Sequence, residues 1–357
     1  MSTLVNARFL SKPVGGVARV GREMLRALLE ELAARSAGER PEIEIAAPPG
    51  VALEGVEQAG AAIVAGPGNL VGEQLMLPLV RPGATILSFA NSTPLLAWRS
   101  IIWIHDAHVF EAPESYSAAY RLWHQNLLRA CVLRGFQVIT VSNYSREALI
   151  EHGANADRTA VIWNGGDHIL RAPADVSVAD AQGLTKDSFV LLVGSRAKHK
   201  NLPFAVQALS QRLPREVTIA VVGLHQEGAY SDSAGVGADA RVRLLPVVSD
   251  AQLRALYERA RAVVIPSVLE GFGLPAAEAL WCSAPLVLAN RTALPEVGGD
   301  AALYFEPDDG DALAACVLQS FEGATRALLL QAGATQRQKF RWRASAKKLV
   351  DEFLTER

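Results

Sequence analysis

Short apolar runs rich in β-branched residues alternate with longer segments of helical periodicity along the whole chain. In the first half these runs predict strands at 3–8, 43–47, 60–64, 84–89, 100–105, 138–142 and 160–163. In the second half they predict strands at 188–194, 217–222, 241–245, 262–266, 285–289 and 302–305. Helices are predicted between them at 19–35, 118–134, 145–152, 201–211, 250–260, 275–283 and 311–320. Strands that are apolar on both faces and alternate with helices are typical of parallel α/β layers.

The two sets of strands predict two domains. Between them, residues 164–187 are rich in Gly, Ala, Asp and Pro and show no sustained period, which favours a boundary there. We therefore expect an N-terminal domain at 1–168, a second domain at 169–338 and a final helical segment at 339–357.

Composition limits the function classes. The chain has 357 residues, of which 50% are hydrophobic and 20% are charged, which suffices for two ordinary cores. A formal net charge of -2 gives no overall attraction to nucleic acid. Three widely spaced cysteines without CxxC spacing are interpreted as reduced core thiols. The N-terminus lacks a basic-then-apolar signal pattern and no run reaches the length of a membrane span, so a cytoplasmic location is expected.

The stretch "EGFGLPAAE" at 270–278 combines two glutamates with a glycine-rich turn before a helix. Gly271 and Gly273 follow a predicted parallel strand, where backbone N–H groups at a helix start bind anions. Glu270 precedes the turn and Glu278 is placed in the first helical turn, and carboxylates accept hydrogen bonds from hydroxyls. A nucleotide sugar offers hydroxyls on both sides of a diphosphate. A simple turn followed by a Glu favoured by the helix dipole remains the alternative.

A second cluster, "VGSRAKHKN" at 193–201, places cations after another predicted strand. Arg196, Lys198 and Lys200 lie in a loop, and Asn201 is expected to cap the following helix. Arg and Lys are suited to a leaving diphosphate that no metal neutralises. A solvated basic loop is the alternative.

Taken together, "VGSRAKHKN", "PSVLEGFGLPAAEAL" and "LPEVGGDAALYFEP" closely resemble the retaining glycosyltransferases of family 4. In the first half, "IIWIHDAHVFEAPESY", "ITVSNYSREAL" and "VIWNGGDH" resemble that family's N-terminal domain, in the expected order. The resemblance spans nearly the whole chain. It implies the α/β GT-B architecture: two facing Rossmann-like domains with parallel sheets, an interdomain cleft and a last helix that crosses back to the first domain.

The resemblance also implies roles for single residues. Glu270 would contact the donor sugar's hydroxyls, and Glu278 would bind the ribose. Arg196 and Lys200 would hold the diphosphate. Backbone amides of Gly271, Phe272, Gly273 and Leu274 would meet the sugar and the phosphates. Gly15 and Gly16 would form a glycine loop of the other domain. His105, with its neighbour Asp106, would lie near the transferred sugar.

Several of these residues also allow a structural interpretation. His105 ends an apolar strand, where histidines are often structural, and the pattern "HDAH" lacks the further ligands of a metal site. Trp103, Trp123 and Trp163 are expected in the core. Ser283 stands where a glycine is common in the family, and the polar loop 224–240 leaves the choice of base open.

The predicted activity is transfer of a hexosyl unit, with mannosyl favoured, from a nucleotide diphosphate sugar to an acceptor hydroxyl with retention. Bacterial surface polysaccharide or glycolipid assembly is the expected context, and the acceptor is a saccharide or a lipid-linked saccharide. A GDP-sugar is favoured over a UDP-sugar, and neither a metal nor another cofactor is expected. The alternatives are a sugar-nucleotide epimerase or isomerase of the same fold and a non-catalytic protein that binds sugar nucleotides.

Peripheral membrane contact is a further hypothesis. In helix 19–35 an apolar stripe formed by Met24, Leu25, Leu28, Leu29 and Leu32 lies near three arginines. Such a helix suits an anionic lipid surface. The alternative is that the stripe faces its own sheet.

Overall fold

The computed structural model describes residues 2–13, 15–223 and 239–355. The chain divides into two compact units, one formed by Met1–Asn164 with Trp342–Arg357 and the other by Gly165–Arg341. The boundaries expected from the sequence, 168/169 and 338/339, lie a few residues from these limits. Most of the polar loop at 224–240 lies outside the described residues.

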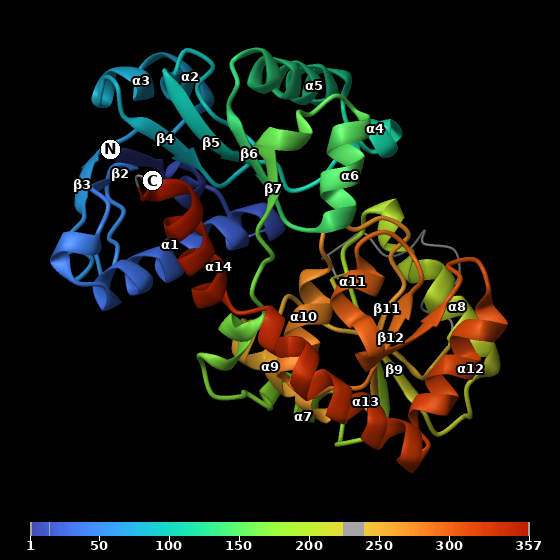
Figure 1. Ribbon diagram of the computed structural model, residues 1–357. Coiled ribbons are helices and arrows are strands. Elements are labelled where there is room, and N and C mark those ends of the chain that lie inside the picture. The colour runs from blue at the N-terminus through green and yellow to red at the C-terminus, as the bar shows by residue number, and fades with distance from the viewer. Residues whose placement is uncertain (1, 14, 224–238, 356–357) are drawn as a thin grey trace. The chain divides into compact units, whose positions relative to one another are not determined.

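The first unit is built on a seven-stranded parallel sheet with strand order β3-β2-β1-β4-β5-β6-β7 (Figure 1). The strands are β1 (Thr3–Asn6), β2 (Ile43–Ala47), β3 (Ala62–Ala65), β4 (Thr85–Ser88), β5 (Arg99–Trp103), β6 (Gln137–Thr140) and β7 (Thr159–Val161). All residues of the central strands β1 and β4 are buried. This burial explains why their sequences show apolar runs in place of strict alternation.

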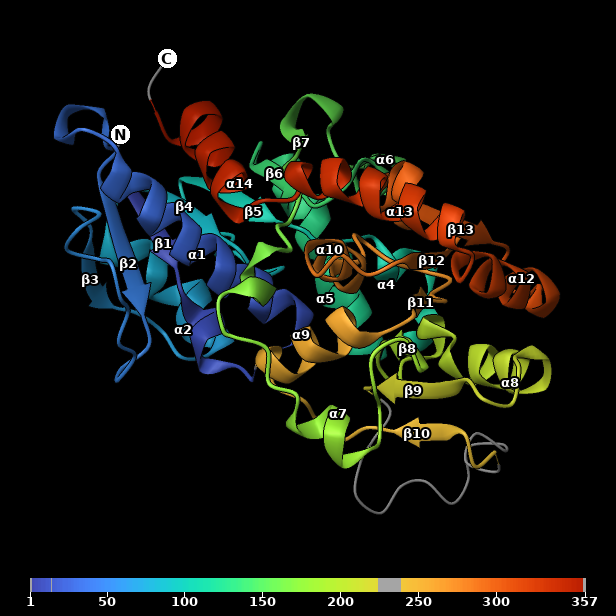
Figure 2. The ribbon, with the colours of Figure 1, turned by 90° about the horizontal axis from the view of Figure 1, so that it is seen from below.

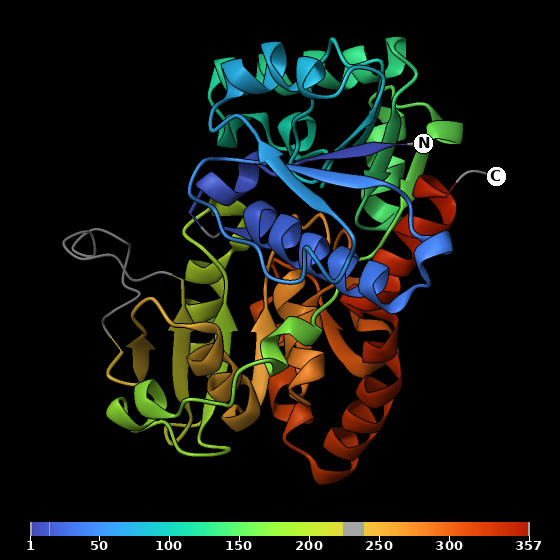
Figure 3. The ribbon, with the colours of Figure 1, turned by 90° about the vertical axis from the view of Figure 1, so that its left-hand side faces the viewer.

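The helices of the first unit come from both ends of the chain. They are α1 (Gly16–Ala34), α2 (Leu70–Leu75), α3 (Leu77–Val80), α4 (His108–Glu111), α5 (Ala118–Leu133), α6 (Asn143–Glu151) and α14 (Trp342–Leu349), which continues as a π-helix at Val350–Leu354. Helix α1 packs against α14, as Figures 1 and 3 show for the blue and red helices.

The apolar stripe of α1 belongs to the core. Its five members, Met24, Leu25, Leu28, Leu29 and Leu32, are each at most 3% exposed. The stripe therefore packs within its own unit, and the interpretation of it as a lipid-facing surface is wrong. Amphipathic helices with this pattern most often cover their own sheet.

The second unit contains a six-stranded parallel sheet with order β10-β9-β8-β11-β12-β13. Figure 2 shows β8, β9 and β10 in succession. The strands are β8 (Phe189–Val193), β9 (Thr218–Val222), β10 (Val242–Leu244), β11 (Ala262–Ile265), β12 (Leu286–Ala289) and β13 (Ala302–Phe305). The helices are α7 (Ser177–Ala181), α8 (Leu202–Arg212), α9 (Asp250–Arg259), α10 (Leu274–Trp281), α11 (Leu294–Gly298), α12 (Gly310–Ser320) and α13 (Gly323–Gln336).

The predicted strands and long helices are confirmed, with ends shifted by a few residues, but several helices were missed. Five of these, α2, α3, α4, α7 and α11, have only four to six residues, too few for a helical period to show. Helix α7 also lies inside the stretch expected to be an irregular boundary. The longer α13 was missed because its N-cap, Glu322, makes no side-chain capping bond that a start signal would reveal.

The last segment of the chain is anchored in the first unit. Trp342 is 2% exposed, and the Ser345 hydroxyl donates to the carbonyl of Trp163 at 2.5 Å. Arg35 of the α1 C-terminus forms an ion pair with Asp351. Within the described residues, no single helix has the length and apolar composition of a membrane span, although the bent pair Gly310–Ser320 and Gly323–Leu354 passes by these two criteria.

We predict that Trp342→Ala lowers the free energy of unfolding of the first unit by about 3–5 kcal/mol, because it leaves a large cavity where a buried indole packed. Arg343→Ala is the matched control, since the Arg343 side chain is exposed, and the buried Glu31 that it contacts at 3.4 Å keeps its ion pair with Arg35. That control should change stability by less than about 1 kcal/mol. Urea unfolding followed by tryptophan fluorescence and far-UV circular dichroism measures both. Equal stability of the two variants would contradict the packing described.

Candidate functional site

In the second unit the order of the strands reverses between β8 and β11, which are neighbours in the sheet. Ligands of open parallel sheets bind at such a point, beyond the carboxyl ends of the strands. The loops that follow the two strands are joined there, because the backbone N–H of Val268 donates to the carbonyl of His199 at 2.8 Å. The two sequence clusters, 70 residues apart at Lys200 and Glu270, are thus brought to one edge.

At this edge Lys200 and Glu270 form an ion pair, with 2.7 Å between Nζ and Oε1. Their side chains are 20% and 9% exposed, so the pair is shielded but still reachable from solvent. Asn201, the next residue, has a left-handed backbone with φ of 54°. Its side chain donates to the carbonyl of Pro307 at 2.9 Å. Asn201 is the N-cap residue of α8, as expected, but with this backbone conformation its side chain makes no capping hydrogen bond.

The turn 270–274 is fixed by its neighbours. The backbone N–H of Glu270 donates to the Thr292 hydroxyl at 3.1 Å. Gly273 is the N-cap of α10 and has φ of 95°, where a Cβ would also lie 2.8 Å from the Leu294 side chain. The ring of Phe272 is buried edge-on against Phe340, with 5.5 Å between centroids. The position at 273 therefore requires glycine.

Glu278 is the fifth residue of α10, since the helix begins at Leu274, so its placement in the first turn was wrong. Its carboxylate is 6% exposed and both oxygens have protein partners. Oε1 lies 3.1 Å from Nε2 of His168, and Oε2 accepts from the Tyr257 hydroxyl at 3.0 Å. A ligand hydroxyl would use the remaining lone pairs of these oxygens.

His168 is a site residue that sequence reasoning left unassigned. A Cβ on Gly166 would lie 2.6 Å from the backbone of Ala277, so only glycine lets this segment lie directly on α10. This close approach brings His168 to Glu278. The motif "WNGGDH" carried the signal, but nothing in the sequence links it to a helix more than 100 residues later.

The remaining predicted donor-site residues are less constrained. Arg196 is exposed in the loop after β8, and Leu274 is half-buried at the start of α10. In the first unit, Gly15 is the N-cap of α1 and Gly16 its first residue. A Cβ at either glycine would meet no atom of the described chain within 4 Å. Packing within the described residues therefore does not explain these two glycines, and their donor role stays a prediction.

His105 follows β5 in the first unit and is 5% exposed. Its Nε2 lies 2.8 Å from the carbonyl of Phe89, and its backbone N–H donates to Asn91 at 2.9 Å. Burial lowers the pKa of His105, against the opposing effects of the Phe89 carbonyl and Asp106. The imidazole is thus neutral at pH 7, and Nε2 carries the proton because it faces a carbonyl.

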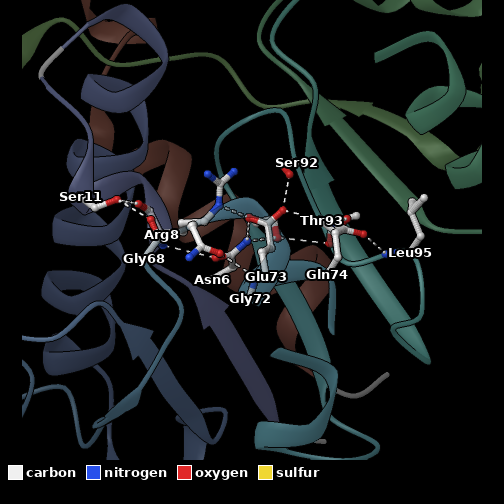
Figure 4. A network of polar contacts seen from close by, with 12 residues as sticks. Asn6, Arg8, Ser11, Gly68, Gly72, Glu73, Gln74, Ser92, Thr93 and Leu95 are labelled. Carbon is white, nitrogen blue, oxygen red and sulfur yellow. Dashed lines mark hydrogen bonds and ion pairs between the residues drawn. The ribbon is translucent and has the colours of Figure 1, made fainter. Parts of the chain in front are cut away.

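Figure 4 shows a buried polar network at the carboxyl ends of β1 and β4 that sequence reasoning did not find. Its centre is Glu73 of α2, which is 1% exposed. Arg8 donates from Nε to Oε2 of Glu73 at 2.5 Å, and Asn6 donates to the same oxygen at 2.9 Å. Single polar residues in separate short elements give no periodic signal, so only the fold reveals that they meet.

The structure also places the cysteines, the tryptophans and Ser283 that the sequence analysis singled out. Cys131 and Cys282 are buried free thiols and Cys316 is partly buried, and burial raises the pKa of Cys131 to about 12.

Trp103 is fully buried, whereas Trp123 and Trp163 are only partly buried. Ser283 has φ of 54°, which explains why glycine suits this position. Among the described residues there is no group of three His, Cys, Asp or Glu side chains that could hold a metal ion.

Comparison with known proteins gives consistent matches. A family model described as "Glycosyl transferases group 1" matches residues 187–322. O-antigen chain mannosyltransferase B from Escherichia coli is 32% identical over 256 residues, which cover 68% of this chain and 67% of that protein. O-antigen chain mannosyltransferase RfbU from Salmonella typhimurium is 28% identical over 223 residues, 61% of this chain and 60% of that protein.

Two solved structures share the fold over nearly the full length. WaaG, a glycosyltransferase involved in lipopolysaccharide biosynthesis, has a TM-score of 0.71 at 15% identity and covers 100% of both chains. HepE from Anabaena, solved in complex with UDP-glucose, has a TM-score of 0.69 at 20% identity and covers 98% of both chains. The fold is therefore GT-B, with two Rossmann-like units.

We predict that Gly273→Ala destabilises the second unit by about 1–3 kcal/mol, because alanine is strained at positive φ and its Cβ meets Leu294. Gly323→Ala is the control: this glycine also lies at a helix start, but its added Cβ meets no described atom. That variant should be neutral or up to about 1 kcal/mol more stable. Thermal unfolding compares the two, and a neutral Gly273→Ala would contradict the geometry of the turn.

Proposed function

The chain belongs to the glycosyl transferases group 1 family, and we propose that this glycosyltransferase moves a mannosyl unit from a nucleotide diphosphate sugar to an acceptor hydroxyl. The mannosyl unit is supported by the two O-antigen mannosyltransferases to which the chain is similar. The same relatives support a role in surface polysaccharide assembly, with a saccharide or lipid-linked saccharide as the acceptor. The observation that carries the proposal is the Lys200–Glu270 pair at the point where the strand order reverses.

The pair suits both parts of a nucleotide sugar. Lys200 presents an ammonium to the diphosphate, and Glu270 presents a carboxylate that accepts hydrogen bonds from sugar hydroxyls. In the described structure each group neutralises the other at 2.7 Å. We propose that the donor inserts its diphosphate beside Lys200 and its sugar beside Glu270, while Arg196 adds a second cation from the same loop. Preorganised charge of this kind is a large source of catalysis.

The turn and helix that follow complete the donor site in this proposal. Backbone amides of Gly271, Phe272, Gly273 and Leu274 meet the sugar and phosphates at the start of α10, where the helix dipole favours negative charge. Glu278 accepts a hydrogen bond from a ribose hydroxyl through the lone pairs that its bonds with His168 and Tyr257 do not use. Their hydrogen bonds hold the carboxylate in place before the donor arrives.

The proposed reaction is a dissociative displacement on one face of the sugar. The bond between the anomeric carbon and the phosphate oxygen breaks, and the acceptor oxygen bonds to the same face of that carbon. The leaving diphosphate takes the acceptor's proton, so no protein nucleophile and no metal are needed. We assign the acceptor to the first unit. We also propose that the neutral imidazole of His105 contacts the transferred sugar and that the Gly15–Gly16 loop contacts the diphosphate.

We predict that Lys200→Met lowers turnover roughly a hundredfold or more, since it removes the cation that stabilises the leaving diphosphate. Glu270→Gln should lower it similarly, because the amide no longer accepts two charge-assisted bonds from the sugar. Lys186→Met is the control, as Lys186 is an exposed lysine that precedes the amino end of β8. Single-turnover transfer of radiolabelled mannose, on variants with native circular dichroism, measures the effect.

Near wild-type transfer by both Lys200→Met and Glu270→Gln would contradict the proposal. The same assay without acceptor separates the alternative activity, because an epimerase or isomerase would convert the sugar nucleotide without any acceptor. A non-catalytic binding protein would consume no donor under either condition.

We further propose that the donor base is guanine, and a thermal-shift panel with GDP, UDP, dTDP and ADP tests it. GDP at 100 times its Kd should stabilise the protein by about 2.7 kcal/mol through mass action, and the other nucleotides should stabilise it less at equal concentration. A larger shift with UDP than with GDP would overturn the assignment of the base but not of the reaction.

A further inference from the structure

A cavity of about 340 Å³ lies at the carboxyl ends of β1 and β4 within the first unit. It is lined by residues that follow these strands and by side chains of α1, α2 and α5. These are Arg8, Lys12, Val17, Leu70, Ala90, Asn91, Ser92, Tyr120, Trp123 and His124. Among the described residues that line it, two are cationic and none is acidic.

Arg8 is the buried cation of this cavity. The residue is 8% exposed, and its Nε is bound to Glu73 at 2.5 Å. Within the described residues its two terminal nitrogens make no hydrogen bond. Figure 4 shows them directed away from Glu73. A guanidinium that is desolvated on one side therefore presents two donor nitrogens to the cavity, the geometry that binds an oxyanion through two parallel bonds.

Glu73 fixes the direction of that guanidinium. Its Oε2 accepts from Arg8 and Asn6, and its Oε1 accepts from the Ser92 hydroxyl and from Gln74 at 3.2 Å. Both carboxylate oxygens are thus occupied, and the residue is 1% exposed. Glu73 neutralises Arg8 without reaching the cavity itself. The network holds the donor nitrogens in one orientation before any ligand arrives, which lowers the entropic cost of binding.

The second cation makes the cavity positive. Lys12 lines it, and burial, with the nearby charge of Arg8 as the second cause, lowers the pKa of Lys12. With Arg8 balanced by Glu73, the charge of Lys12 has no lining carboxylate to compensate it. An anion in the cavity would supply that compensation.

Aromatic side chains form another part of the lining. Tyr120, Trp123 and His124 occupy one face of α5 at helical spacing. Aromatic rings beside a few directed polar groups are suited to the apolar face of a sugar ring. The cavity therefore combines a surface for a sugar with a cationic end for an oxyanion.

We propose that this cavity is an acceptor subsite for a saccharide that carries an oxyanion, a phosphoryl group or a carboxylate, bound by the terminal nitrogens of Arg8 and by Lys12. The inference rests on the proposed function for the identity of the ligand as acceptor. Arg8 is a specificity-determining residue in this account, and Glu73 is a positioning residue that acts through Arg8.

The test measures binding to the full chain in the presence of saturating GDP, so that the donor site is occupied. Three probes are compared by ligand-observed NMR: methyl α-mannoside, mannose 6-phosphate and methyl α-mannuronoside. At least one charged probe should bind wild type about tenfold or more tighter than the neutral probe, as expected for a charge-assisted pair of bonds. The ratio between the two charged probes distinguishes a phosphoryl acceptor from a carboxylate acceptor.

Arg8→Met should remove this preference while leaving the affinity for GDP and for the neutral probe unchanged. Arg8→Met/Glu73→Gln guards against misfolding, since it leaves no uncompensated buried charge, and should show the same loss. Arg8→Lys should restore only part of the preference, because a lysine ammonium cannot donate two parallel hydrogen bonds as a guanidinium does. Arg99→Met, which removes an exposed arginine of the same unit, is the control and should bind like wild type.

Equal affinity of wild type for charged and neutral probes would overturn the proposal. A loss of GDP affinity in Arg8→Met as large as the loss of probe affinity would overturn it too, by showing that Arg8 serves the donor diphosphate. Because the readout is binding, charged-probe preference without any mannosyl transfer would contradict the proposed function and leave the anion subsite in place.

Discussion

The proposed donor site depends on one ion pair, Lys200 with Glu270, that the topology of a parallel sheet makes possible. Neighbouring parallel strands end at the same edge, so the loops after β8 and β11 meet although they are distant in sequence. A lysine and a glutamate at such an edge are shielded enough to interact strongly and open enough to be reached. The turn at Gly273 and the buried Glu278 extend the same edge along α10.

In the first unit, too, an ion pair forms beyond the carboxyl edge of a parallel sheet, but the charge that faces the ligand is different. Arg8 and Glu73 also meet beyond the carboxyl ends of parallel strands, but here the carboxylate is saturated by four donors and only the cation faces the cavity. In the second unit both members of the pair remain within reach of a ligand. A buried carboxylate that orients a cation suits an anionic group, whereas an accessible pair suits a ligand with both hydroxyls and phosphates.

Much of this arrangement could be predicted from the sequence because it rests on contiguous signals. The apolar runs located the strands, and "EGFGLPAAE" carried the turn, the helix start and both glutamates within nine residues. What could not be predicted depends on contacts between distant segments. His168 reaches Glu278 only because Gly166 lies against the backbone of Ala277. Nothing in the sequence marks Arg8 and Glu73 as partners, because they meet only when the sheet brings the end of β1 to α2. The short helices could not be predicted for another reason, because a single helical turn is too short to show a helical period.

The central claim, that the donor lies on the edge formed by Lys200, Glu270 and the start of α10, is tested most directly by a crystal structure of the protein with bound GDP. The account predicts diphosphate oxygens within hydrogen-bond distance of Lys200 Nζ and of backbone N–H groups between Gly271 and Leu274, with a ribose hydroxyl at Glu278. GDP bound elsewhere, with the Lys200–Glu270 pair undisturbed and no phosphate near α10, would contradict it.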